Sequence, residues 1–268
     1  MAVGRERLIS GTRMVGTKKS LGQHWLKNRE ILNEIADLAN ERSAQSDSDK
    51  IGLCLEIGPG LGFLTSSLLR RFDRVVAIEF DDRLAENLPK SFPGKNLEVI
   101  KGDFLQYDLG MVEEPYVIAG NIPYYITSPI IEKVLTAPRL PERVVLLIQK
   151  EVAERILSDK ETVLSLFVKN RAKVSAGPVV PAIEFTPPPK VDSEVIVMEP
   201  HLPEVGEEVF DLIRRGFVAP RKKLVHNLAG MKSREELKKA FASVGCSADA
   251  RPGDLSLSMW QLLYDALS

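Results

Sequence analysis

The stretch "LCLEIGPGLG", residues 53–62, joins a short apolar run to three closely spaced glycines. The run predicts a buried strand, and Gly58, Gly60 and Gly62 then lie between this strand and a following helix. Missing side chains at such a turn let a ligand approach the backbone and the helix N-terminus. A dinucleotide fingerprint would need its third glycine at Phe63, so the loop disfavours NAD.

Four further apolar runs follow, separated by helix-like stretches. A helical apolar repeat, "NREILNEIADLAN" at 28–40, precedes them all. This alternation predicts an α/β fold with a doubly wound, mostly parallel sheet, whose ligands gather at the carboxyl ends of the strands. The four runs are "RVVAIEF" (74–80), "LEVIKGD" (97–103), "YVIAGN" (116–121) and "RVVLLIQ" (143–149).

The pattern becomes less regular after residue 149. A helix is predicted for "EVAERIL" (151–157) and a strand for "KVDSEVIVME" (190–199). From about residue 203 the pattern is helical, and "SREELKKAFASVG" (233–245) opens with a capping box and closes at a glycine. We therefore expect three parts: an N-terminal basic tail (1–17), an α/β domain (18–202) and a small all-helical domain (203–268).

Composition limits the class of protein. The 268 residues are 44% hydrophobic and 27% charged, as in ordinary globular proteins. No run of 18 apolar residues and no apolar leader are present, which predicts a cytoplasmic protein without a membrane partner. The two cysteines, Cys54 and Cys246, form no metal-ligand pattern, so we expect reduced thiols and no metal.

Basic residues gather in two segments, although the formal net charge is only -1. One is the N-terminal segment 1–29, and the other is the segment 211–232, which contains Arg221, Lys222 and Lys223. A single basic cluster is most often a solvated surface, so each one is weak evidence for nucleic acid.

Acidic residues end two of the predicted strands. Glu79 follows Gly58 by 21 residues, the spacing at which an acid accepts hydrogen bonds from a ribose diol. Asp103 is suitably placed to accept from an adenine amino group. S-adenosylmethionine contains ribose and adenine but no pyrophosphate. The E-x-G-x-G loop followed by two acids is the arrangement of class I methyltransferases, and a methyl group can pass from sulfonium to nitrogen without a metal.

The stretch "NIPYY", residues 121–125, ends another strand and resembles the [N/D]-P-P-[Y/F] element of amino-group methyltransferases. An adenine N6 lone pair is delocalised into the ring, so acceptors must hold its N–H groups and turn the lone pair toward the donor. The side-chain oxygen of Asn121 can accept there, and Tyr124 offers a face on which the base stacks. Tyr125 fits a stacking role and a core role equally.

Six motifs together resemble the small-subunit ribosomal RNA adenine dimethyltransferases, the KsgA family, from about residue 18 to the end. In that family the enzyme makes two N6,N6-dimethyladenosines from adjacent adenines in the hairpin loop near the 3′ end of the small-subunit RNA, and it acts as a late checkpoint on subunit assembly. The motifs are "KKSLGQHWL" (18–26), "LEIGPGLG" (55–62), "NIPYY" (121–125), "QKEVAER" (149–155), "FTPPPKVDS" (185–193) and "ARPGDLSL" (250–257).

The resemblance implies roles for particular residues. Asn121 and Tyr124 would hold the target base, and Phe185 would close its other face or anchor the "TPPP" corner in the core. Phosphates of the small-subunit RNA would meet Arg221, Lys222 and Lys223 in the helical domain. The methyl donor, S-adenosylmethionine, would contact His24, Leu26, Gly58, Glu79, Asp103 and Asn121.

Two departures from the family pattern stand out. His24 and Trp25 replace the usual Asn-Phe pair, so an imidazole stands where the family has an amide. The stretch "LSDKETVLSLF" (157–167) is shorter than usual and lacks a Gly-Arg-Leu-Ser run, which puts any RNA contact there in question.

Other functions remain open from the residues. A large-subunit adenine dimethyltransferase of the antibiotic-resistance type shares the strand-end motifs, but the sequences "PPPKVDS" and "RPGDLSL" favour the small-subunit enzyme. A non-catalytic assembly or transcription factor on the same fold would show a damaged donor site, whereas these motifs are intact. We expect a monomer.

Overall fold

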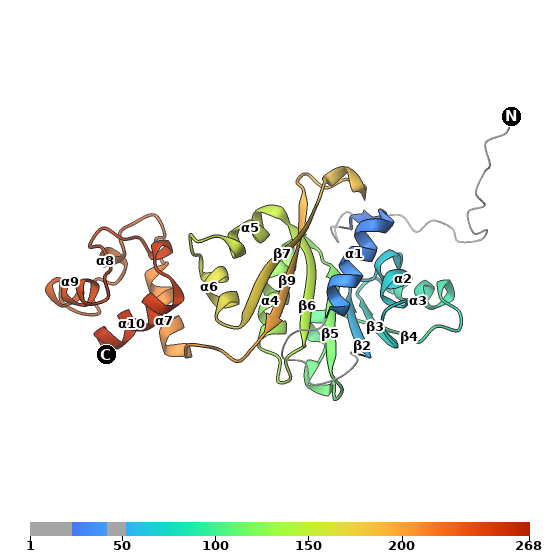
Figure 1. Ribbon diagram of the computed structural model, residues 1–268, viewed down its shortest axis with the longest axis horizontal. Coiled ribbons are helices and arrows are strands. Elements are labelled where there is room, and N and C mark those ends of the chain that lie inside the picture. The colour runs from blue at the N-terminus through green and yellow to red at the C-terminus, as the bar shows by residue number, and fades with distance from the viewer. Residues whose placement is uncertain (1–22, 42–51) are drawn as a thin grey trace.

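A computed structural model describes residues 23–41 and 52–268 of the chain and contains a seven-stranded mixed sheet (Figure 1). The five strands predicted before residue 150 are confirmed and run parallel to one another. Two antiparallel strands complete one edge. In sheet order the strands are β4 (Leu97–Lys101), β3 (Arg74–Glu79), β2 (Leu53–Ile57), β5 (Tyr116–Asn121), β6 (Arg143–Gln149), β9 (Ser193–Pro200) and β7 (Ala172–Val180).

Helices cover both faces of the sheet, because neighbouring strand residues point to opposite sides. Cys54 packs in the core cluster under the first two helices, as a buried thiol, and Leu55 packs in the cluster on the other face. The first face carries α1 (Arg29–Asn40) and α2 (Phe63–Leu68), and α3 (Asp82–Ser91) lies beside β3 and β4. The other face carries α4 (Thr127–Leu135), α5 (Lys150–Leu157) and α6 (Val163–Lys169).

Strand β7 and the two-stranded sheet of β1 (Trp25–Leu26) with β8 (Phe185–Thr186) are elements that the sequence did not predict. Gly177 and Pro178 interrupt the apolar pattern of β7, and its register with β9 shifts between Ala176 and Val179. Proline removes a ladder donor and is found at sheet edges and bulges. The edge position therefore explains why a strand with these residues is tolerated.

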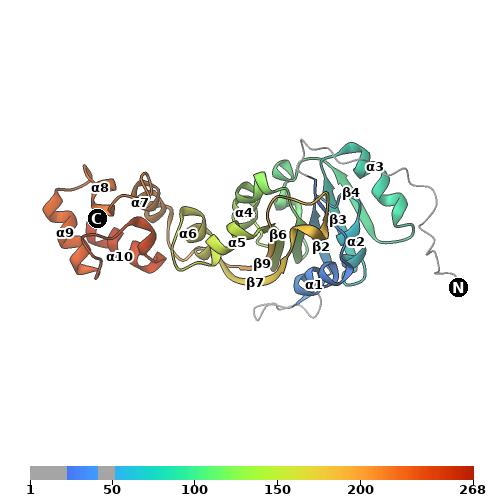
Figure 2. The ribbon, with the colours of Figure 1, turned by 90° about the horizontal axis from the view of Figure 1, so that it is seen from above.

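The C-terminal helices form most of a third core, which contains the fully buried Trp260 and also Leu166 of α6. They lie at the opposite end of the molecule from β2–β4 in both views (Figures 1 and 2). The predicted capping box of Ser233 and Glu236 is confirmed, and Gly245 follows that helix with a φ of 67°. The helices are α7 (Glu207–Gly216), α8 (Leu224–Asn227), α9 (Arg234–Ser243) and α10 (Leu257–Leu267).

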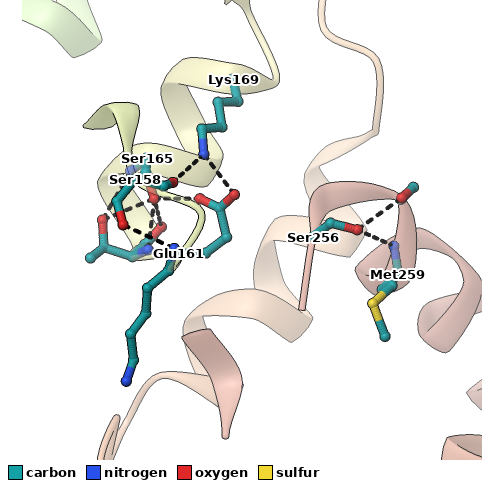
Figure 3. A network of polar contacts seen from close by, with 9 residues as sticks. Ser158, Glu161, Ser165, Lys169, Ser256 and Met259 are labelled. Carbon is teal, nitrogen blue, oxygen red and sulfur yellow. Dashed lines mark hydrogen bonds and ion pairs between the residues drawn. The ribbon is translucent and has the colours of Figure 1, made fainter. Parts of the chain in front are cut away.

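A polar network lies where the C-terminal helices meet the α5–α6 connection (Figure 3). Lys169 Nζ donates to Glu161 Oε1 and to the Ser158 carbonyl at 2.7 Å each, and Ser165 donates to Glu161 Oε2 at 2.6 Å. The Glu161 backbone N–H donates to the Gly253 carbonyl at 2.9 Å. The stretch 157–167, which departs from the family pattern, thus ties the helical part to the α/β part.

Five short 3₁₀ turns complete the described structure. No helix in the described ranges is long and apolar enough to span a bilayer. Within the same ranges, no group of His, Cys, Asp and Glu has a geometry that could hold a metal. The turns are η2 (Phe104–Gln106), η3 (Leu109–Met111), η4 (Tyr124–Ile126), η5 (Ala182–Glu184) and η6 (Pro252–Asp254).

Candidate functional site

A partly open pocket lies at the carboxyl ends of β2, β3, β4 and β5. Parallel strands end at the same edge of a sheet, so residues that follow them meet in space even when they are far apart in sequence. The pocket is lined by all the residues predicted to contact the methyl donor: His24, Leu26, Gly58, Glu79, Asp103 and Asn121, together with Tyr124 and Tyr125.

The glycine loop after β2 has left-handed backbone at each of its three glycines, with φ between 59° and 82°. A Cβ atom on Gly62 would lie 2.6 Å from Leu88 Cδ1, so this glycine is required for packing against α3. A Cβ atom on Gly58 would meet nothing within 4 Å. Gly58 therefore leaves open space at the pocket wall, where a ligand can approach the backbone closely.

Glu79 is held rigidly at the end of β3. Its Oε1 accepts from the Asp81 N–H at 2.8 Å, and its Oε2 accepts from the Gly60 N–H at 2.9 Å. Burial raises the pKa of this carboxyl, while the two backbone donors act in the opposite direction. Each oxygen retains a second lone pair, so the anchored carboxylate can accept from a pair of ribose hydroxyls.

Asp103 caps the turn η2 after β4. Its Oδ1 accepts from the Leu105 N–H at 2.9 Å, which fixes the orientation of the carboxylate. Among the described residues, the other oxygen accepts no hydrogen bond. One carboxylate oxygen of Asp103 is therefore available as an acceptor at the pocket wall.

Glu56 lines the pocket but was not among the site residues predicted from the sequence. It is only 1% exposed, and in the described part of the chain its Oε2 has no hydrogen-bond partner. Burial raises the pKa of Glu56 to about 8. A buried carboxyl oxygen without a partner fits a ligand that brings a positive charge, and the methionine end of S-adenosylmethionine carries an ammonium group. The signal in the sequence was the acid that opens E-x-G-x-G.

The raised pKa of Glu56 predicts a pH-dependent stability. The folded chain holds this proton more tightly than the unfolded chain between pH 4.5 and about 8, so stability falls as pH rises through that window and levels off above it. Because the amide in Glu56→Gln does not titrate, we expect its melting temperature to exceed that of the wild type by an amount that grows from pH 5 to pH 8. Thermal unfolding at several pH values measures this.

The exposed Glu132 on α4 supplies the matched control for that measurement. Glu132→Gln should follow the wild-type pH profile, because surface substitutions change stability by only about 0.5 kcal/mol or less. A Glu56→Gln profile parallel to that of the wild type would contradict the assignment of a raised pKa to Glu56.

Asn121, at the end of β5, is positioned by the N-terminal segment. Its Nδ2 donates to the His24 carbonyl at 3.0 Å, which leaves Oδ1 as the acceptor that this amide presents. This carbonyl belongs to the backbone, so any residue at position 24 supplies it. The histidine that stands here in place of the family's usual asparagine therefore keeps the contact. The His24 ring donates from Nδ1 to the Pro187 carbonyl at 2.7 Å, because a carbonyl can only accept.

Tyr124 is half-buried and held from two sides. Its hydroxyl lies 2.7 Å from Ser193 Oγ, and its ring lies nearly parallel to His24, with 6.1 Å between ring centroids and 16° between planes. Burial raises the pKa of the Tyr124 phenol, which therefore stays neutral. A ring held in this way offers a fixed surface for stacking.

Phe185 does not lie in the pocket. It is 2% exposed, belongs to the core cluster beneath α1, and pairs in β8 with Leu26 of β1. A base cannot stack on a side chain that the core already covers. The prediction that Phe185 closes the second face of the base is therefore wrong, and its alternative role as a core anchor is the one that the packing supports.

The basic residues Arg221, Lys222 and Lys223 line a shallow depression beside α8, together with His226, Asp249 and Arg251. Lys223 pairs with Asp249 at 2.5 Å. The depression surrounds α8, and Figure 2 shows α8 at the opposite end of the molecule from β2, β3 and β4, at whose ends the pocket lies. The predicted tail 1–17 and the basic residues before position 23 lie outside the described residues.

Comparisons with known proteins agree with this architecture. The family model described as "Ribosomal RNA adenine dimethylase" matches residues 14–265. Proteins named "Ribosomal RNA small subunit methyltransferase A" are similar throughout. The one from Thermosynechococcus vestitus is 36% identical over 267 residues, which is 95% of this chain and 98% of the relative. The one from a Nostoc species is 38% identical over 275 residues, 95% and 99%.

Two solved structures resemble the fold over most of its length. The 23S rRNA methyltransferase ErmE superposes with a TM-score of 0.74 and 27% identity, covering 91% of this chain and 99% of that one. A dimethyladenosine transferase from Plasmodium falciparum gives a TM-score of 0.71 and 28% identity, covering 90% and 96%. The likeness includes both the sheet and helices beyond it.

Proposed function

The chain belongs to the ribosomal RNA adenine dimethylase family, and on that premise we propose that it dimethylates N6 of two adjacent adenosines in the 3′-terminal hairpin loop of small-subunit ribosomal RNA. The observation that carries the proposal is one pocket that joins the residues for a methyl donor, Gly58, Glu79 and Asp103, to Asn121 and Tyr124. The names of the curated relatives favour the small subunit over the large one.

In this proposal the donor is S-adenosylmethionine, which supplies a methyl group activated by a sulfonium centre. Glu79 would hold the ribose diol, Asp103 the adenine amino group, and the backbone at Gly58 would admit the donor to the pocket wall. Glu56 Oε2, buried without a partner in the described structure, would face the ammonium end. His24, just before β1, and Leu26 on β1 would close one side of the pocket.

On the acceptor side, Asn121 Oδ1 would accept from an N–H of the target N6 and turn its lone pair toward the methyl group. The Asn121 amide is already fixed by its bond to the His24 carbonyl, so little reorganisation is needed at the moment of transfer. Tyr124 would carry the extruded base on its ring. The methylated nitrogen is a strong acid, so it loses its proton without a strong general base.

The proposal also concerns how the protein recognises a precursor of the small ribosomal subunit. We infer that residues 18–202 perform the transfer, that residues 203–268 bind ribosomal RNA through the depression around Arg221, and that the protein acts as a cytoplasmic monomer on a small-subunit precursor. Support comes from the core that the C-terminal helices form with Leu166 of α6 and from the grouping of basic side chains on these helices. Two distant contact points favour recognition of a folded particle by shape.

Transfer of labelled methyl from S-adenosylmethionine to undermethylated small subunits, large subunits and naked RNA tests the function. We expect label as N6,N6-dimethyladenosine in small subunits alone. Label in large-subunit RNA would place the protein with the antibiotic-resistance enzymes. Binding to small subunits without any label would show a non-catalytic assembly factor, and either result would overturn the proposal.

Replacing the basic depression residues is expected to weaken RNA binding without touching the donor site. The double variant Arg221→Ala with Lys222→Ala should lower the magnitude of the slope of log affinity against log salt by about one to two units. Each phosphate contact that is lost no longer releases a counterion when the RNA binds. Titration of small subunits at several salt concentrations measures the slope. Lys238→Ala with Lys239→Ala, on the exposed face of α9, is the matched control. Equal slopes for both doubles would reject the assignment.

A further inference from the structure

Tyr125 is a large aromatic side chain left in solvent at the mouth of the pocket. It is 65% exposed, although the residues around it on β5 and α4 are mostly buried. Its ring and hydroxyl make no ring contact or hydrogen bond with any residue in the described ranges. Tyr125 nevertheless lines the same pocket as Asn121 and Tyr124. It is neither a core aromatic nor a surface residue remote from the site.

The backbone of η4 separates the two tyrosines. Successive side chains of a 3₁₀ turn project about 120° apart, since the turn has three residues. The Tyr124 side chain points into the protein, where it contacts Ser193 and His24. Tyr125 therefore points to a different side and cannot stack on the same face of the same base.

The position of Tyr125 also separates it from the donor. The other strongly exposed aromatic of the pocket lining, Phe80, is 60% exposed and follows Glu79 at the end of β3, on the donor side. Tyr125 follows Asn121 on β5, on the side where the target amino group must lie. An aromatic ring on that side, open to solvent, can be reached by a base that stays outside the pocket.

We propose that Tyr125 is a substrate-positioning residue that stacks on the base next to the target adenine. This inference rests on the proposed function and deepens it. When the target base is extruded into the pocket, the base next to it loses its stacking partner. The ring of Tyr125 takes the place of that partner. Because the two targets are adjacent, the second adenine lies on Tyr125 while the first lies on Tyr124, and a shift of one nucleotide then brings the second adenine onto Tyr124.

Substitutions at Tyr125 separate stacking from other roles. Tyr125→Ala should raise KM for undermethylated small subunits by roughly tenfold, the size expected for one lost base–aromatic contact, and leave the Kd of S-adenosylmethionine unchanged. Tyr125→Phe and Tyr125→Trp should stay within about threefold of the wild type, since both keep an aromatic face. Met111→Ala is the matched control, because Met111 is 74% exposed on η3 and does not line the pocket.

A substrate in which the base next to the target is changed tests stacking directly, because a purely structural role of Tyr125 would not make KM depend on that base. Small subunits whose RNA carries uridine in place of one adenosine of the pair should raise KM for the wild type, because a pyrimidine stacks more weakly. The same replacement should leave KM of Tyr125→Ala nearly unchanged. If the replacement changes both enzymes equally, or if Tyr125→Phe is as impaired as Tyr125→Ala, the stacking role is wrong. A wild type that methylates no small subunit would instead refute the proposed function.

Discussion

Asn121→Ala is expected to lower kcat for methyl transfer to small subunits by about two to three orders of magnitude, the effect of removing one well-aligned hydrogen-bonding group from an active site. The substitution removes the Oδ1 acceptor for the target N6 and also breaks the bond to the His24 carbonyl. Single-turnover transfer of labelled methyl, with enzyme in excess over small subunits, measures the chemical step directly.

Asn121→Asp is the informative control, because it keeps an oxygen acceptor but replaces the N–H donor to His24 with a charged oxygen. Its rate should lie between those of the wild type and Asn121→Ala. Binding of small subunits should change little in either variant, since the basic depression is remote from the pocket. A full rate for Asn121→Ala would mean that the amino group is oriented by other groups, and it would remove Asn121 from the catalytic residues.

Glu79→Ala is expected to weaken S-adenosylmethionine binding by about a hundredfold, because a buried charged acceptor for two hydroxyls is lost. It should also lower the melting temperature of the free protein, since the Gly60 and Asp81 N–H groups lose their acceptor in a buried setting. Calorimetric titration with the donor and thermal unfolding without it measure the two effects separately.

Glu79→Gln is the conservative control. The amide retains one acceptor oxygen, so only one of the Gly60 and Asp81 N–H groups keeps its partner, and we expect stability and donor affinity each to recover only in part. Unchanged donor affinity in both Glu79 variants would contradict the ribose role and leave Glu79 as an organiser of the glycine loop alone.

Much of the site could be predicted because its signals are local. Gly58, Glu79, Asp103 and Asn121 each follow a run whose periodicity marks a parallel strand. The carboxyl ends of parallel strands share one edge, so a prediction of the strands is also a prediction that these residues meet. The confirmed strand ends show that this reasoning needed no knowledge of distant contacts.

The aromatic residues could not be resolved in the same way. Phe185 suits a stacking surface and a core equally by residue type, and its burial depends on the pairing of β8 with β1, two-residue strands too short for a pattern. Tyr125 was equally ambiguous, and it proved exposed because η4 turns it away from Tyr124. Whether Glu56 Oε2 finds a partner likewise depends on which side chains surround it.

The sequence by itself therefore determined the helices, the parallel strands and the polar groups that end them, because periodicity, glycine and capping act over a few neighbouring residues. The tertiary structure alone decided which rings and carboxylates are covered and which face the pocket. Burial results from contacts between segments distant in the chain, such as β1 with β8 and Asn121 with His24, and no local pattern specifies those contacts.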